Sequence, residues 1–153
     1  MLQTKRNVIV LALCCCLAMV WNGAALAASP YGQWLTEGGK SRVEIAECDN
    51  SLCGKIVWLA EPLDEAGQEK LDKNNPDAAL QSRPILGLAL LNGFVPGDEK
   101  TVWVDGEIYN PEDGETYSCT LTLQDDGTLK VRGYVGLPLF GKTQIWTRAP
   151  KTE

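Results

Sequence analysis

Three carboxylates crowd the segment 110–115, where Glu112, Asp113 and Glu115 share a stretch that also holds a proline and a glycine. Paired carboxylates do acid–base chemistry when one of them is desolvated. A turn of this composition normally faces water, which favours a solvated turn over a catalytic pair. An enzyme that uses Asp113, Glu115 or the thiol of Cys119 is therefore the weakest of the functional hypotheses.

The chain contains no histidine. Its absence removes Ser-His and Cys-His nucleophilic pairs, His-ligated zinc and the commonest general acid–base group. No Gly-rich phosphate cradle leads from a strand into a helix, so nucleotide binding has no support. Asp72, Asn74, Asn75 and Asp77 gather oxygen atoms but lack the glycine and the distal glutamate of a calcium loop. The sequence predicts a protein that is not an enzyme and has no cofactor or metal.

The six cysteines fall into three groups: three near the N-terminus, a closely spaced pair, and one that stands alone. Those at 14–16 lie in an apolar N-terminal run and are interpreted as apolar fillers. Cys48 and Cys53 flank a polar, turn-like insert, and opposed positions at the mouth of a hairpin are close enough for a disulfide in an oxidising compartment. A redox pair is the alternative, although it lacks the C-x-x-C spacing. Cys119 is expected to be buried and inert.

The first 27 residues have the organisation of a secretory signal. Lys5 and Arg6 precede an apolar run over 8–21, and the small-x-small pattern of a cleavage site stands at 25–27. The run is too short to span a bilayer and has no positive flank after it. We therefore expect a cleaved signal over residues 1–27, and a mature protein in a bacterial periplasm or outside the cell, without stable membrane insertion.

Residues 28–153 then form one domain, long enough for a hydrophobic core but not for two. The whole chain carries a net charge of −6, and loss of Lys5 and Arg6 with the signal makes it more acidic. No basic stretch compensates. On electrostatic grounds, nucleic acids and anionic lipid surfaces are poor partners.

The elements that must position these side chains are strands, because apolar and polar residues alternate between turns rich in Gly and Asp. Asp105-Gly106 and Asp125-Asp126-Gly127 are typical hairpin turns. Strands at this spacing indicate an all-β, antiparallel barrel, with a β-sandwich as the alternative. The predicted strands are 33–36, 42–47, 53–59, 101–104, 107–109, 117–123, 128–135 and 143–148.

The middle of the chain departs from this pattern. Residues 61–83 are polar and predict one long loop, in which Asp77 caps a single helical turn. Residues 84–94 are strongly apolar and punctuated by glycine. They predict either a buried strand with a bend or a flexible flap over an apolar interior.

Two resemblances add to this interpretation. Gly32-x-Trp34 on the first strand and Arg148 on the last resemble the pair that closes one end of a lipocalin-type barrel, where the arginine lies across the indole. Residues 31–148 also resemble the family called domain of unknown function 2147, small secreted bacterial proteins. Besides Cys48, the matching stretches are 32–34, 43–45, 52–58, 75–77, 83–87, 106–117, 129–136 and 141–148.

The family resemblance implies an exported, lipocalin-like barrel, dimeric in one interpretation, with no catalytic residues to transfer. Asn110 stands where the family usually has Asp, which weakens a metal or acid role at that position. Fold alone does not give a function.

The first functional hypothesis is a binding module whose barrel mouth holds a small apolar or amphipathic molecule. Arg83 and Arg132 are candidates to orient an acidic head group. Core packing is the alternative role for each aromatic candidate. The candidate wall residues are Trp58, Trp103, Tyr109, Tyr134 and Trp146.

The second hypothesis is an envelope interaction protein. The apolar segment 84–94 or an edge strand would form a homodimer or dock on a partner protein.

Overall fold

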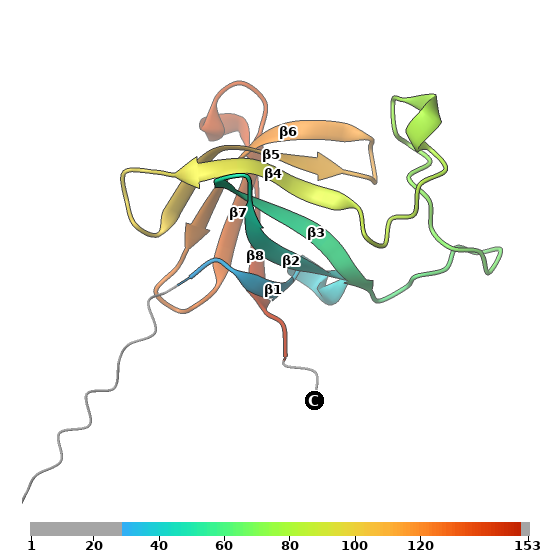
Figure 1. Cartoon of the computed structure of the whole chain (residues 1–153), viewed down its shortest axis with the longest axis horizontal. Coiled ribbons are helices and arrows are strands. Elements are labelled where there is room, and N and C mark those ends of the chain that lie inside the picture. Colours follow the sequence, from blue (N-terminus) through green and yellow to red (C-terminus); the bar gives the residue numbers. More distant parts are fainter. Residues whose placement is uncertain (1–28, 151–153) are drawn as a thin grey trace, which may run out of the picture.

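The computed structural model describes residues 29–150, so the signal expected over residues 1–27 lies outside the described residues. Within this part of the chain, eight antiparallel strands close into a barrel in chain order (Figure 1). The predicted barrel is confirmed, and the sandwich alternative is wrong because the last strand pairs with the first. The strands are β1 (Gly32–Leu35), β2 (Ser41–Cys48), β3 (Ser51–Leu59), β4 (Ala89–Pro96), β5 (Val102–Asn110), β6 (Glu115–Leu123), β7 (Leu129–Tyr134) and β8 (Lys142–Arg148).

Short 3-10 turns interrupt the connections: η1 (Glu37–Gly39), η2 (Ala78–Leu80) and η3 (Pro138–Phe140). Asp77 caps η2 as predicted, because its carboxylate accepts a hydrogen bond from the N–H of Ala79 at 2.9 Å. No helix in residues 29–150 combines the length and the apolar character needed to cross a bilayer.

The barrel closes where β1 meets β8, at the pair Trp34 and Arg148. Trp34 is fully buried, and its indole N–H donates to the carbonyl of Pro30 at 2.7 Å. The Arg148 guanidinium lies 3.9 Å from the centre of the Trp34 ring and donates to the carbonyls of Ser29 and Tyr31. The arginine therefore covers the indole and fastens the incoming chain in one arrangement.

Side chains fill the inside of the barrel. The Phe94 ring occupies the space that a Cβ at position 106 would need, so only glycine fits there. A small barrel is normally filled in this way rather than hollow. The buried core consists of Trp34, Val43, Ile45, Leu52, Ile56, Leu88, Leu90, Leu91, Phe94, Cys119, Leu121, Leu123, Leu129, Val131 and Trp146.

The hairpin turn predicted at Asp105-Gly106 is wrong. The structure has one strand, β5, running through both residues, and its register with β6 shifts between Trp103 and Gly106. Asp105 has a φ of 58°, so the dipeptide forms a β-bulge. Asp tolerates a positive φ, so the Asp-Gly pair suits this bulge as well as a hairpin turn.

Residues 84–94 enter the core, so the buried-strand interpretation holds and the flap interpretation is wrong. Leu88 and Leu90 are buried, and the strand β4 begins at Ala89. Gly93 bends this strand with a φ of 76°. Leu88, Leu90 and Leu91 are therefore not available as a docking surface, whereas Leu86 is exposed.

The predicted disulfide between Cys48 and Cys53 is confirmed at the β2–β3 hairpin, with the two Cα atoms 5.9 Å apart. Asp49 and Asn50 make the turn with φ values of 49° and 64°. Short polar side chains are the ones that tolerate this conformation. The hydroxyl of Ser51 donates to the Cys48 carbonyl at 2.8 Å and completes the turn.

Candidate functional site

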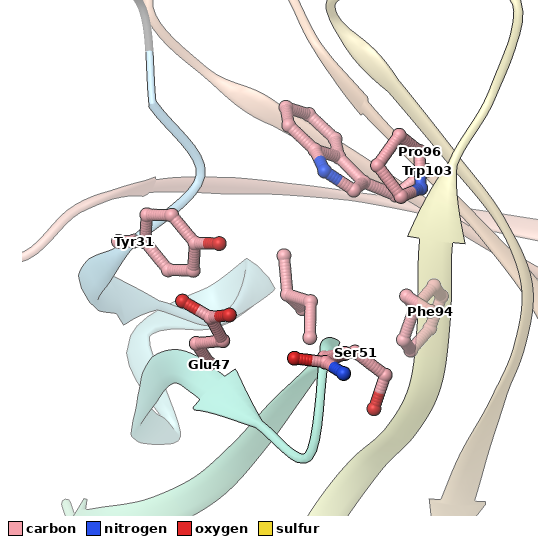
Figure 2. Close-up of a pocket in the computed structure, with 8 residues that line it drawn as sticks. Tyr31, Glu47, Ser51, Phe94, Pro96 and Trp103 are labelled. Atoms are coloured by element: carbon pink, nitrogen blue, oxygen red, sulfur yellow. The ribbon is translucent and has the colours of Figure 1, made fainter.

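A recess of about 50 Å³ lies at one end of the barrel, between the β2–β3 hairpin and the β4–β5 connection (Figure 2). Leu52 and Phe94 are buried and form its floor. Tyr31 and Glu47 lie on one side of the view in Figure 2, and Trp103 and Pro96 on the other. The lining residues are Tyr31, Glu47, Asn50, Ser51, Leu52, Phe94, Pro96 and Trp103.

The chemistry of this recess is aromatic and anionic. The Glu47 carboxylate and the Trp103 indole N–H make no hydrogen bond or ion pair with residues 29–150, so both remain available to a ligand. Tyr31 and Trp103 add ring faces, which attract cations when the cation sits over the ring. Pockets for drug-sized ligands measure roughly 300–1,000 Å³. A recess of about 50 Å³ therefore holds one end of a ligand and leaves the rest outside.

Among the aromatic residues named from the sequence, only Trp103 lines the recess. Trp146 is buried in the core, and Tyr134 is half-buried at the end of β7. Trp58 is 38% exposed, with the Arg42 guanidinium 4.9 Å from its ring centre. The β2–β3 register shifts between Arg42 and Val43, next to the Arg42–Trp58 pair.

Arg132 does not face the recess either. Its Nε donates to the carbonyl of Pro138 at 2.7 Å, and its two terminal nitrogens donate to Thr143 Oγ1 at 2.7 Å and to the Leu139 carbonyl at 3.2 Å. The guanidinium therefore holds the β7–β8 connection in shape. That Arg132 orients the head group of a ligand stays a prediction, because its guanidinium does not line the recess.

Tyr109 and Arg83 do meet, around Asp72, one of the residues that were compared with a calcium loop in the sequence. Asp72 is fully buried. It accepts hydrogen bonds from the Tyr109 hydroxyl at 2.6 Å, from Arg83 Nε at 2.8 Å and from Asn75 Nδ2 at 2.9 Å. The Arg83 guanidinium also lies 5.5 Å from the Tyr109 ring centre. These four residues, the Asp72 cluster, fasten the long β3–β4 connection to the barrel wall.

Burial raises the pKa of the Asp72 carboxyl, but hydrogen bonds from Tyr109, Asn75 and Arg83 outweigh burial and leave that pKa below its usual value. Burial and the neighbouring carboxylate raise the pKa of Tyr109. Asp72 thus stays ionised and Tyr109 stays protonated at neutral pH. Because the carboxylate is already bound on both oxygens, the cluster serves structure rather than a ligand.

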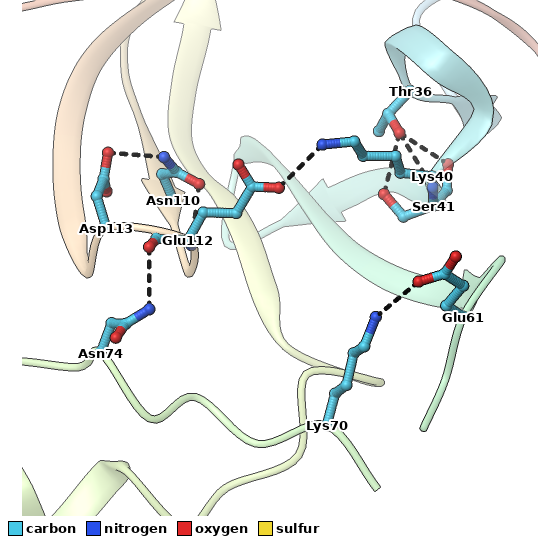
Figure 3. A network of polar contacts seen from close by, with 9 residues as sticks. All are labelled: Thr36, Lys40, Ser41, Glu61, Lys70, Asn74, Asn110, Glu112 and Asp113. Atoms are coloured by element: carbon cyan, nitrogen blue, oxygen red, sulfur yellow. Dashed lines mark hydrogen bonds and ion pairs between the residues drawn. The ribbon is translucent and has the colours of Figure 1, made fainter. Parts of the chain in front are cut away.

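Exposed polar contacts at the end of the barrel opposite the recess tie three connections together (Figure 3). Asn74 Nδ2 donates to the carbonyls of Pro111 and Glu112 at 3.2 and 2.9 Å. The Glu112 carboxylate forms an ion pair with Lys40 beside η1 at 3.1 Å. The Asn74 carbonyl also occupies the space that a Cβ at Gly114 would need. The long connection is therefore packed against the β5–β6 turn.

In the acidic turn, Asp113 is held by local hydrogen bonds. Asp113 accepts hydrogen bonds from Asn110 Nδ2 at 2.7 Å and from the Tyr117 hydroxyl at 2.9 Å. Burial raises the pKa of Asp113, but these bonds and the backbone N–H of Glu115 outweigh it and lower that pKa overall. A general acid needs a raised carboxyl pKa, so this carboxylate shapes the turn instead. Within residues 29–150, no group of three or more His, Cys, Asp or Glu side chains could hold a metal ion.

Cys119 is expected to resist alkylation in the folded protein. Its thiol is fully buried on β6, and burial raises its pKa to about 12. The thiolate is the reactive species. Iodoacetamide at neutral pH should therefore modify it only as fast as the barrel unfolds. Mass spectrometry over time measures this rate. In protein that begins at residue 28, urea should expose one thiol while the Cys48–Cys53 disulfide stays closed. Rapid labelling of the native protein would contradict a buried, inert thiol.

Comparison with known proteins places this geometry in context. The sequence matches the family described as "Uncharacterized protein conserved in bacteria (DUF2147)" over residues 32–148. No curated protein matches the sequence. A solved structure, described as "Protein HP1028 from the human pathogen Helicobacter pylori belongs to the lipocalin family", is similar with a TM-score of 0.67 and 26% sequence identity. The similarity covers 80% of this chain and 84% of that chain.

Proposed function

Because the chain belongs to the DUF2147 family of uncharacterized bacterial proteins and folds as a lipocalin-like barrel, we propose that it is an exported binding protein. Its ligand would be a small amphipathic molecule with a cationic head group, bound at the recess between Glu47 and Trp103. No catalytic step is part of this proposal. The N-terminal segment over 1–27 supports export.

The observation that carries the proposal is the unpaired Glu47 carboxylate, which lies on the Tyr31 side of the recess with the Trp103 indole on the other side. A carboxylate attracts a cation, and aromatic faces stabilise one further when water is displaced. The net charge of −6 attracts cations to the whole molecule. Since the barrel interior is filled, the apolar tail would remain outside, against the exposed Tyr31 and Pro96.

Titration calorimetry with decyltrimethylammonium, below its micelle concentration, tests the proposal. Replacing Glu47 by Gln should weaken binding of this cationic probe by about five- to tenfold, since it removes one charge contact. Decyl glucoside, which has a neutral head group, should bind weakly and equally to both proteins. Trp103→Ala should weaken binding of the cationic probe by a similar factor.

The matched control is Glu61→Gln, which removes the same charge from an exposed side chain far from the recess. It should leave the affinity for the cationic probe unchanged. If the cationic probe does not bind, or if Glu47→Gln and Glu61→Gln behave alike, the recess is not the binding site.

A further inference from the structure

The connection between β7 and β8 displays an apolar surface that no other described residue covers. Val135 is 72% exposed, Leu137 64%, Leu139 79% and Phe140 76%. In Figure 1 this connection, which includes η3, forms a loop beyond the ends of β7 and β8. Contiguous apolar side chains at such exposure mark a contact surface. We call residues 135–140 the apolar tip.

The apolar tip has a fixed shape. The Arg132 guanidinium donates to the carbonyls of Pro138 and Leu139 from inside the loop. The backbone N–H of Phe140 donates to the Leu137 carbonyl at 3.1 Å. These bonds tie down the backbone polar groups and leave the side chains pointing away from them. The loop therefore binds without first paying the conformational entropy of ordering.

The strands that carry the apolar tip are basic, although the whole chain has a net charge of −6. Lys130, Arg132 and Lys142 lie on β7 and β8, and no acidic residue occurs between Gly127 and Arg148. The Glu37 carboxylate contacts this hairpin at Ile145, away from the tip, where it accepts a hydrogen bond from the backbone N–H at 3.4 Å. Lys142 lies at the base of the apolar tip, whereas Lys130 pairs with Ile145 away from it and Arg132 is bound to the loop carbonyls. An exposed apolar loop with a free lysine at its base combines the two attractions, apolar and electrostatic, by which a segment binds an anionic lipid surface.

We propose that the apolar tip docks on an anionic phospholipid surface, with Leu139 and Phe140 among the head groups and Lys142 against the phosphates. A single convex loop offers too little area for a stable protein dimer, which needs roughly 800 Å² from each partner. A bilayer needs only shallow insertion, about 5–10 Å deep. The proposal does not depend on the ligand recess.

The two sites lie at opposite ends of the barrel. In an antiparallel barrel with strands in chain order, the β2–β3 and β4–β5 connections share one end, and the β7–β8 connection lies at the other. A molecule docked through the apolar tip would therefore present the recess away from the lipid surface.

Vesicle co-sedimentation tests this proposal. The protein is used in the form in which it is purified from the bacterium that expresses it. The wild type should bind vesicles of phosphatidylglycerol and phosphatidylethanolamine more tightly than vesicles of phosphatidylcholine. Leu139→Ser combined with Phe140→Ser should weaken binding to the anionic vesicles at least about tenfold. Lys142→Glu should weaken it about fivefold at low salt and less at high salt.

The matched control is Leu63→Ser combined with Leu86→Ser, which removes two exposed leucines from the long β3–β4 connection. It should bind vesicles as the wild type does, and circular dichroism should show all variants folded. Equal vesicle binding by the tip variant and this control would overturn the proposal. The proposal would also be overturned if the wild type does not bind vesicles and sedimentation velocity shows that the wild type is a dimer and the tip variant a monomer.

Discussion

Replacing Trp34 by alanine is expected to lower the free energy of unfolding by about 3–5 kcal/mol. The indole is fully buried, and the cavity left behind would lie between the Arg148 guanidinium and the core. The substitution also leaves the Pro30 carbonyl without its donor. Urea denaturation followed by far-ultraviolet circular dichroism measures this loss without depending on tryptophan fluorescence.

Trp58→Ala is the matched control, since it removes the same side chain beneath an arginine guanidinium at a partly exposed position. The cation–π contact there is worth about 1 kcal/mol or less. Comparable losses from Trp34→Ala and Trp58→Ala would mean that the β1–β8 contact does not stabilise the barrel as its burial indicates.

Replacing Asp72 by alanine is expected to lower the free energy of unfolding by about 3 kcal/mol, because it removes the buried acceptor of Tyr109, Asn75 and Arg83 together. The long β3–β4 connection should also detach from the barrel. Urea denaturation measures the first effect. Limited proteolysis measures the second, as faster cleavage within residues 60–88.

The pH dependence of stability distinguishes the Asp72 carboxylate from simple packing. Its pKa is lower in the folded protein than in the unfolded chain, so its contribution is present above the unfolded pKa of about 3.9. That contribution is lost as the pH falls through the folded pKa. The difference between wild type and Asp72→Ala should therefore narrow in strong acid.

Glu61→Ala provides the comparison for Asp72→Ala, because the Glu61 ion pair with Lys70 is exposed on the same connection. Exposed pairs contribute little, so this variant should resemble the wild type in denaturation and proteolysis. A pH-independent difference for Asp72→Ala, or a loss no larger than that of Glu61→Ala, would contradict the ionic role assigned to the cluster.

Alternation and turn chemistry predicted most of the strands, because a half-buried strand must repeat every two residues. They failed at Asp105-Gly106, where the same dipeptide serves a bulge inside β5. They also gave no sign of the register shift between Arg42 and Val43, because that shift is a property of the paired strands rather than of either sequence. Neither irregularity leaves a local signal that separates it from regular structure.

The candidate site was less accessible to sequence reasoning. Asp72 looked like a solvated loop residue because its partner Tyr109 lies far along the chain and meets it only in the folded barrel. The recess combines Glu47 from β2 with Trp103 from β5, which no local pattern joins. The net charge, likewise, hid the basic β7–β8 hairpin, since a sum over the chain discards where the charges lie.

The pairing of β1 with β8 has a consequence for how the molecule is made. Every other ladder joins strands that are consecutive in the chain, so those hairpins can form as soon as their second strand is synthesised. The seam at Trp34 and Arg148 cannot form until nearly the whole polypeptide has left the ribosome. Contacts of such long sequence separation are slow to form. Until synthesis ends, any sheet that the growing chain forms is therefore open and has two unpaired edges, which are exposed to pairing with other chains.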